Sequence, residues 1–150
     1  MGKKRYVFHH DTERCIKCYA CEIACQQWHC IPAGTVKLLR VQEENKGVFP
    51  NIKRIFHVET CRHCDDAPCV TVCPENAISK REDDGIVIVD SGKCNGCRAC
   101  LEVCPFNIPQ FDASGIMQKC DLCLDRLVES KNPICSDACP TQALHWSLST

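Results

Sequence analysis

The stretch Cys94–Pro105, CNGCRACLEVCP, has the spacing C-x2-C-x2-C-x3-C-P and decides how the rest of the chain is interpreted. Thiolate sulfur is a soft ligand that suits iron, and the two-residue spacings let one tight loop supply three ligands to the corners of a cube. This run of cysteines is typical of proteins that bind 4Fe–4S clusters. In two-cluster proteins the fourth cysteine binds the neighbouring cluster, so the stretch predicts a partner motif elsewhere in the chain.

The end of this stretch predicts a short helical turn. Cys100 and Cys104 stand at i and i+4, so both would lie on one helix face and look toward a second cluster. Pro105 has no N–H and cannot extend a helix, so we expect the turn to end just after the last ligand.

Three further cysteine motifs accompany the first stretch. Cys15–Cys25, CIKCYACEIAC, has the same spacing, but Gln26 replaces the proline, so we expect its helix to continue to about Pro32. Cys61–Pro74 reads C-x2-C-x4-C-x3-C-P, with a wider loop between its second and third cysteines. The last motif is spread over residues 120–140 and reads C-x2-C-x11-C-x3-C-P.

The number of cysteines favours four clusters. Four motifs of four use 16 of the 17 cysteines, which predicts four 4Fe–4S clusters. Four zinc sites would use the same number, but zinc sites pair C-x2-4-C knuckles across a longer spacer. Three ligands within seven residues, followed by x3-C-P, are the cluster pattern. The remaining cysteine, Cys30, is expected to be a free buried thiol.

Composition excludes several other classes of protein. With 17 cysteines in 150 residues, the chain belongs with disulfide scaffolds or metal proteins. The cysteine number is odd and no apolar signal stretch follows the basic start, so a secreted disulfide protein is not expected. The apolar run Ile86–Val89 is far shorter than the roughly 20 residues of a membrane span. The formal net charge of −1 argues against nucleic-acid binding.

Between the motifs, the sequence predicts short strands and helices. We expect strands at Arg5–Phe8, Val36–Val41, Ile52–Val58, Ile86–Val89 and Ala143–Trp146, a short hairpin within 106–119, and a helix after Cys123 that turns Leu124, Leu127 and Val128 inward. The two strands around the turn-rich EENKGVFPN form a hairpin that is either scaffold or a partner-docking surface. His9 and His10 are expected to be solvated, and Trp28 to pack over a cluster.

Six side chains in or beside the cysteine loops are candidates for tuning cluster potentials. They are Lys17, Arg62, His63, Lys93, Arg98 and Lys119. A cube with four thiolates carries a charge of about −2 when oxidised, so a nearby cation favours reduction. For any one of the five Lys and Arg residues, a solvated surface charge is an equal alternative. His63 is expected to act as a dipole near the cluster and not as a ligand.

Catalytic motifs are missing from the sequence. It contains no Ser-His-Asp spacing, no Gly-rich phosphate loop and no dinucleotide fingerprint. We therefore expect a non-catalytic electron carrier that needs partner proteins.

With these motifs, the chain resembles the four-cluster iron–sulfur subunits of molybdopterin oxidoreductases, which contain molybdenum or tungsten. The resemblance rests on CYACEIAC with the following IPAG, ETCRHCDDAPCVTVCPENAI, CNGCRACLEVCPFNIPQFD, and MQKCDLC with ACPTQAL. Relatives of this kind serve dimethyl sulfoxide, thiosulfate and polysulfide reductases, formate dehydrogenases and hydrogenase-linked formate complexes.

The resemblance implies that the motifs share four clusters. The expected ligands are Cys15, Cys18, Cys21 and Cys139 (set A), Cys25, Cys120, Cys123 and Cys135 (set B), Cys61, Cys64, Cys69 and Cys104 (set C), and Cys73, Cys94, Cys97 and Cys100 (set D). It also implies an α+β fold of small strands and short helices, made of two pseudo-symmetric ferredoxin-like units. Residues 61–105 would form one unit, inserted into another made of 1–60 and 106–150.

The resemblance further implies that the chain links a molybdopterin or tungstopterin catalytic subunit to a second redox partner. That partner would be a hydrogenase, another iron–sulfur subunit or a membrane quinone-linked subunit. Longer relatives carry an extra C-terminal segment, sometimes a membrane anchor, and this sequence stops short of it. Our first expectation is therefore a compact soluble complex that oxidises formate or reduces CO2. A respiratory sulfur-compound or sulfoxide reductase comes second, and a structural docking module stapled by zinc or clusters third. The expected location is cytoplasmic, with a periplasmic or membrane-associated location through partner subunits as the alternative.

Overall fold

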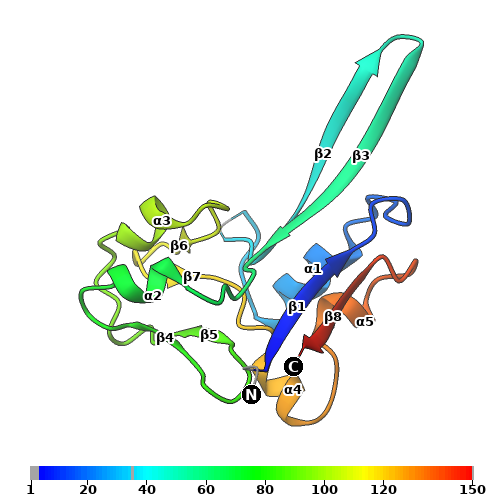
Figure 1. Ribbon diagram of the computed structural model, residues 1–150. Helices are drawn as coiled ribbons and strands as arrows, with labels where there is room; N and C mark the ends of the chain where they lie inside the picture. The colour runs from blue at the N-terminus through cyan, green and yellow to red at the C-terminus, as the bar shows by residue number, and fades with distance from the viewer. Residues whose placement is uncertain (1–3, 35, 150) are drawn as a thin grey trace.

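The computed structural model describes residues 4–34 and 36–149 and confirms a mixed fold of small strands and short helices (Figure 1). Met1–Lys3, in the basic start, Thr35 and Thr150 lie outside the described residues. The elements, in chain order, are β1 (Arg5–His10), α1 (Ala20–Trp28), β2 (Leu39–Val48), β3 (Asn51–Thr60), α2 (Pro68–Val72), β4 (Ile78–Lys80), β5 (Val87–Val89), α3 (Ala99–Val103), β6 (Gln110–Phe111), β7 (Met117–Gln118), α4 (Leu124–Val128), α5 (Ile134–Asp137) and β8 (Leu144–Ser149). No helix in the described part has the length and apolar character that crossing a membrane requires.

The described strands form four separate two-stranded antiparallel sheets. Their pairs are β1 with β8, β2 with β3, β4 with β5, and β6 with β7. In the first pair, Arg5 lies opposite Ser149 and His10 opposite Leu144, so the two ends of the chain lie side by side (Figure 1). The second pair extends from the rest of the molecule as an arm.

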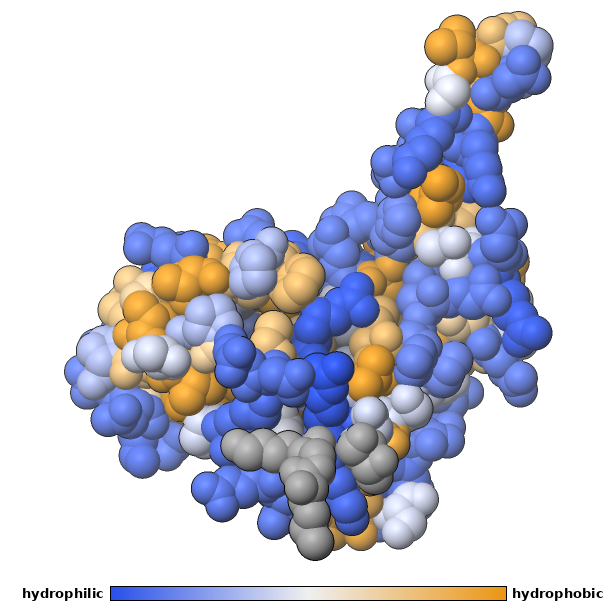
Figure 2. All heavy atoms as spheres, viewed as in Figure 1, coloured by the Kyte–Doolittle hydropathy of each residue, from blue (hydrophilic) through white to orange (hydrophobic). Residues whose placement is uncertain are grey.

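The arm, residues 39–60, is longer than the sequence predicts, because ladder pairing continues to Val48 and Asn51 at the tip. Its tip is apolar and its stem hydrophilic (Figure 2), and the side chains of Val48 and Phe49 are 81% and 83% exposed. At its base, the hydroxyl of Thr60 donates a hydrogen bond of 3.1 Å to the carbonyl oxygen of Leu38. Above its base the arm also contacts the body through the ion pairs of Glu43 with Lys17 and of Lys53 with Glu13, the latter over 3.0 Å.

Two hydrophobic cores hold the body together, and cysteines take part in both. The first core joins α1, the base of the arm and the β1–β8 pair; its buried members include Phe8, Cys25, Leu39 and Leu144. The second core joins β4, β5, β7 and α3; its buried members are Ala67, Ile78, Val87, Cys100 and Met117. Cys21, Cys25 and Cys135 are buried in the first core and Cys100 in the second, so thiols fill places that larger apolar side chains occupy in other proteins.

The helices follow the proline signals. Helix α3 ends at Val103, before Cys104 and Pro105, as the stretch predicts. Helix α1 has no proline after Cys25 and continues to Trp28, short of the predicted Pro32, where the N–H of His29 bonds to the carbonyl oxygen of Cys25.

The structure corrects several sequence predictions about side chains. Val128 points to solvent and is 76% exposed, because α4 has only five residues, too few to bury three apolar side chains on one face. Cys30 is exposed, not buried. Packing of Trp28 over a cluster stays a prediction: the side chain lies against α4, where its Nε1–H donates to Asp125 Oδ2 (2.9 Å) and the Arg126 guanidinium lies 4.6 Å from its ring centre.

The histidine pair in β1 also differs from the prediction of solvated side chains. The His9 ring stacks on the ring of His145, with their centres 4.7 Å apart, and its Nε2 lies 2.7 Å from Ser147 Oγ. His10 is half-buried, because β1 continues two residues beyond the predicted strand.

Candidate metal centres

The four cysteine motifs share one backbone turn. In the first C-x2-C segment of each motif, the residue before the second cysteine has a left-handed conformation: Lys17 (φ 56°), His63 (φ 47°), Gly96 (φ 73°) and Leu122 (φ 64°). Glycine adopts this conformation freely, whereas the other three side chains are strained by it. A left-handed residue at the same place in four loops, strained in three of them, indicates that the loops are built to place sulfur atoms.

Backbone N–H groups point at the cysteine sulfur atoms. The N–H of His63 lies 3.5 Å from Cys61 Sγ, and the N–H of Leu122 lies 3.3 Å from Cys120 Sγ. After two of the Cys-Pro pairs the relation also repeats: Ala77 donates to Cys73 Sγ and Ala143 to Cys139 Sγ, both at 3.3 Å. Such donors stabilise a thiolate, which is the form that binds iron.

A second repeated turn follows each Cys-Pro pair. Asn76, Asn107 and Gln142 all have left-handed backbones and donate to the carbonyl oxygen of the cysteine three residues earlier, at 3.2–3.3 Å. This turn was not predicted from the sequence, although a Cys-Pro-x-Asn/Gln pattern marks it at all three places.

Asp11 and Asp90 are a further pair that was not predicted from the sequence. Each lies four residues before the first cysteine of its motif, and its side chain accepts the backbone N–H two residues later, at 2.9 and 3.0 Å. Each also donates its own N–H, over 2.7 Å, to the alanine that follows a Cys-Pro turn, Ala143 and Ala77 respectively. The spacing Asp-x3-Cys, which is the same at both places, is the sequence pattern that could have identified this pair.

The structure brings the cysteines of set A together at one cavity. Cys15, Cys18, Cys21 and Cys139 all line it. Burial, with a smaller contribution from the neighbouring Cys139, Cys15 and Cys18, raises the pKa of Cys21 to about 11.

Set B lies inside the first core. Cys25 is buried, which raises the pKa of its thiol, and Cys120, Cys135 and Cys123 are its electrostatic neighbours. Burial likewise raises the pKa of Cys123 and of Cys135 to about 12.

Set C lines a second cavity, to which Cys61, Cys64, Cys69 and Cys104 all contribute. Burial raises the pKa of Cys64 and Cys69, and Cys61 adds to the effect on both.

Set D lies at the second core. Cys73, Cys94 and Cys100 pack there, and Cys97 is an electrostatic neighbour of Cys100. The N–H of Met117 lies 3.5 Å from Cys94 Sγ.

These four groups fit iron–sulfur clusters as ligands. Buried thiols with raised pKa values stay protonated at neutral pH unless a cation replaces the proton, and several negative sulfurs at one place need compensating positive charge. Iron supplies that charge, and the N–H donors at the sulfur atoms suit the thiolates that hold it. When bound, a 4Fe–4S cluster takes up and releases one electron at a time.

Exposure differs between the sets. Among the motif cysteines, Cys18 of set A and Cys97 of set D are exposed, whereas every member of sets B and C is buried or intermediate. The sets approach one another through neighbouring cysteines, namely Cys21 with Cys135, Cys120 with Cys61, and Cys69 with Cys100. This arrangement gives the spatial order A, B, C, D with the exposed ligands at the two ends.

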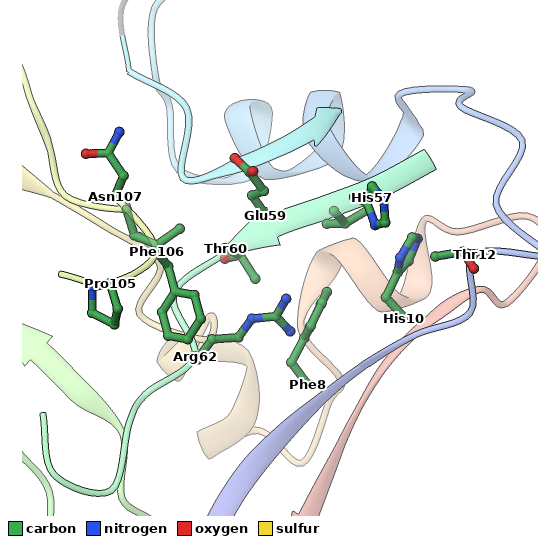
Figure 3. A pocket seen from close by; sticks show the side chains of 12 residues that line it. Phe8, His10, Thr12, His57, Glu59, Thr60, Arg62, Pro105, Phe106 and Asn107 are labelled. Carbon is green, nitrogen blue, oxygen red and sulfur yellow. The ribbon is translucent and has the colours of Figure 1, made fainter. Parts of the chain in front are cut away.

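The six candidate tuning residues lie in very different surroundings. Lys17 forms an ion pair with Glu43, Lys93 lies 3.8 Å from Asp90, and the Arg98 guanidinium lies 4.8 Å from the Phe111 ring centre. Arg62 borders an open cleft next to set C, and its guanidinium lies 4.4 Å from the Phe8 ring centre (Figure 3). Only His63 and Lys119 of the six are buried.

His63 is a buried, uncharged ring. Its Nδ1 accepts the N–H of Val87 at 3.0 Å, and burial, with the nearby Lys119 and Lys80 charges, lowers its pKa well below the usual value. The ring meets that of Trp146 edge-on, with centres 5.9 Å apart. His63 therefore acts as a packing residue with a dipole, not as a charge.

Comparison with known proteins supports a cluster-binding chain. A family model described as "4Fe-4S dicluster domain" matches residues 52–148, and one described as "4Fe-4S binding domain" matches residues 12–28. The prediction that the cofactors are 4Fe–4S clusters is thereby confirmed.

Three curated proteins illustrate the similarity. The probable anaerobic dimethyl sulfoxide reductase chain YnfG of Escherichia coli (strain K12) is 40% identical over 95% of this chain and 73% of its own length. The thiosulfate reductase electron transfer subunit PhsB of Salmonella typhi is 39% identical over 95% of this chain and 75% of its own. A sulfite dehydrogenase subunit of Allochromatium vinosum is 37% identical over 89% of this chain and 64% of its own.

Proposed function

Because the chain belongs to the family of iron–sulfur electron-transfer subunits of molybdopterin-type oxidoreductases, we propose that it connects a pterin catalytic subunit to a second redox partner. The observation that carries the proposal is the order of the cysteine sets, with the exposed ligands Cys18 and Cys97 at opposite ends. A carrier between two partners needs one accessible end for each. No cysteine of the two middle sets is exposed, as is expected of sites that exchange electrons only within the chain.

The ligand sets are part of this proposal. Sets A and B combine the first and last motifs, and sets C and D combine the two middle motifs, so the fourth cysteine of each motif binds the cluster of its partner motif. The neighbours of Cys21, Cys25 and Cys69 support this division.

The insertion of one ferredoxin-like unit into another is also a proposal. The matching contacts of Asp11 with Ala143 and of Asp90 with Ala77 support it, because they pair equivalent places in the two units. Phe111 and Met117 pack in the second core, so we place the end of the inner unit after residue 118 instead of 105.

We place the catalytic partner among sulfoxide or sulfur-compound oxidoreductases, the alternative that the sequence ranked second. The named relatives are subunits of dimethyl sulfoxide, thiosulfate and sulfite enzymes. They do not support the formate complex, which was the first expectation from the sequence. The chain itself is proposed to be non-catalytic, and its cytoplasmic location stays a prediction.

The test is anaerobic purification of the native complex through a tag on this chain. We expect a large molybdenum- or tungsten-containing subunit, about 16 irons on this chain, and reduction of a sulfoxide or sulfur oxyanion with reduced viologen as donor. A complex that turns over formate but none of these compounds would contradict the choice of partner. A chain that carries zinc would contradict the electron-transfer function itself.

A further inference from the structure

Lys119 is a buried lysine at the junction of the two cores. Its residue is 8% exposed, and it is the single cation among the buried residues of the described part of the chain. Its Nζ donates to the carbonyl oxygen of Val87, on β5, and to that of Cys120 at 2.9 Å. Burying an ammonium group is costly unless negative charge lies nearby.

No protein carboxylate supplies that negative charge. Within residues 4–34 and 36–149, no Asp or Glu oxygen lies at ion-pair distance from the Lys119 Nζ. The side chain instead lines the set C cavity, together with all four cysteines of that set. Its other neighbour, Cys120, belongs to set B.

Lys119 is close to cysteines of both sets. It is an electrostatic neighbour of Cys69, in set C, and of Cys120, in set B, whose carbonyl oxygen accepts a hydrogen bond from its Nζ. Because Cys120 and Cys61 are themselves neighbours, Lys119 lies where sets B and C approach each other.

We propose that Lys119 is a shared cation that raises the reduction potentials of the two middle clusters, those of sets B and C, together. The inference rests on the proposed function, since it requires clusters at both sets. A cluster gains one negative charge on reduction, and a cation in a poorly hydrated interior stabilises that charge more than an exposed cation does. Lys119 thus shifts the potentials of both middle sites in the same direction, upward.

Lys93 offers a matched control within the same chain. It also comes directly before the first cysteine of a motif, Cys94, but its side chain is 62% exposed and lies 3.8 Å from Asp90. Solvent and the carboxylate screen its charge. Because Lys93 and Lys119 have the same position relative to a motif but only Lys119 is buried, comparing them separates the effect of burial from that of sequence position.

The experiment is anaerobic redox titration of the holo chain followed by EPR, which reports each cluster separately. We would compare the wild-type chain with K119Q, which keeps amide donors without the charge, with K119R, which keeps the charge, and with K93Q. In K119Q we expect two of the four midpoint potentials to shift downward and the other two to stay in place. K119R is expected to show the wild-type values of both potentials, and K93Q to leave all four potentials unchanged.

Each outcome supports or overturns the proposal. A K119Q chain with a full iron content and four unchanged potentials would overturn it, and so would a K119R chain with the same shifts as K119Q. Loss of iron from K119Q and K119R alike would also overturn it, because the residue would then act through shape and not charge. A wild-type chain without clusters would instead contradict the proposed function and leave no potentials to compare.

Discussion

At the residue scale, Cys18 and Cys30 form an informative pair, since both thiols are exposed but only Cys18 belongs to a motif. Replacing Cys18 by serine gives set A a hard oxygen ligand that suits iron–sulfur chemistry poorly. We expect C18S to lose one of the four cluster signals and up to about four irons. Iron and sulfide analysis with EPR measures this, and C30S serves as the control with all signals intact. Loss of a cluster from C30S would show that the division into four sets is wrong.

Glu22 illustrates a buried carboxylate that holds two elements together. It is 6% exposed on α1, its Oε2 accepts the N–H of Val41 at 3.0 Å, and its Oε1 pairs with Lys37 at 2.5 Å. Because E22A leaves the Val41 N–H without this acceptor, we expect a loss of about 1–3 kcal/mol in the free energy of unfolding. Anaerobic denaturant titration followed by circular dichroism measures it.

The control for this change is Glu102→Ala. Glu102 stands in the first turn of α3, two residues after Cys100, but it is exposed. Its removal is expected to change stability by no more than about 0.5 kcal/mol. Equal losses in the two variants would mean that the contacts of Glu22 with β2 contribute nothing.

At the element scale, the outer part of the arm, beyond the pair Glu43–Phe56, extends away from the cluster-binding body. Its ion pair with the body joins Lys53 to Glu13 over 3.0 Å, and Val48 and Phe49 at its tip are 81% and 83% exposed. We therefore expect that replacing residues 44–55 by a two-residue Asn-Gly turn, which suits a tight hairpin, leaves the iron content and the four EPR signals unchanged. The shortened hairpin retains the ion pair of Lys17 with Glu43. A drop in iron content would show that the arm takes part in holding the clusters.

At the scale of the whole molecule, the cysteine spacing predicted more of the structure than the pattern of apolar residues did. The motifs are local, so they predicted the cluster loops, the end of α3 before Pro105 and the continuation of α1 past Cys25. The length of the arm was missed, because a turn-rich run such as EENKGVFPN also pairs as strands once the ladder extends. The burial of Lys119 depends on how the two cores meet, and the exposure of Val128 on how short α4 is, and no local pattern records either.

The two cores also lead to a prediction of the order in which the clusters are lost during unfolding. Ile78 and Leu144 occupy equivalent places, each at the start of a strand directly after a Cys-Pro turn and an alanine, and they are 4% and 2% exposed. Ile78 packs in the second core, with cysteines of sets C and D, and Leu144 in the first, with cysteines of sets A and B. Truncation of either to alanine is expected to cost about 2–5 kcal/mol.

Because each core surrounds two sets, the two truncations should release different clusters. We expect I78A to lose the signals of sets C and D first in a slow anaerobic denaturation, and L144A to lose those of sets A and B first. EPR at successive denaturant concentrations follows the loss, with C18S and C97S identifying one signal of each pair. If all four signals disappear together in both variants, the two cores unfold as one unit. The chain would then be a single cooperative domain, although its two halves have similar structures.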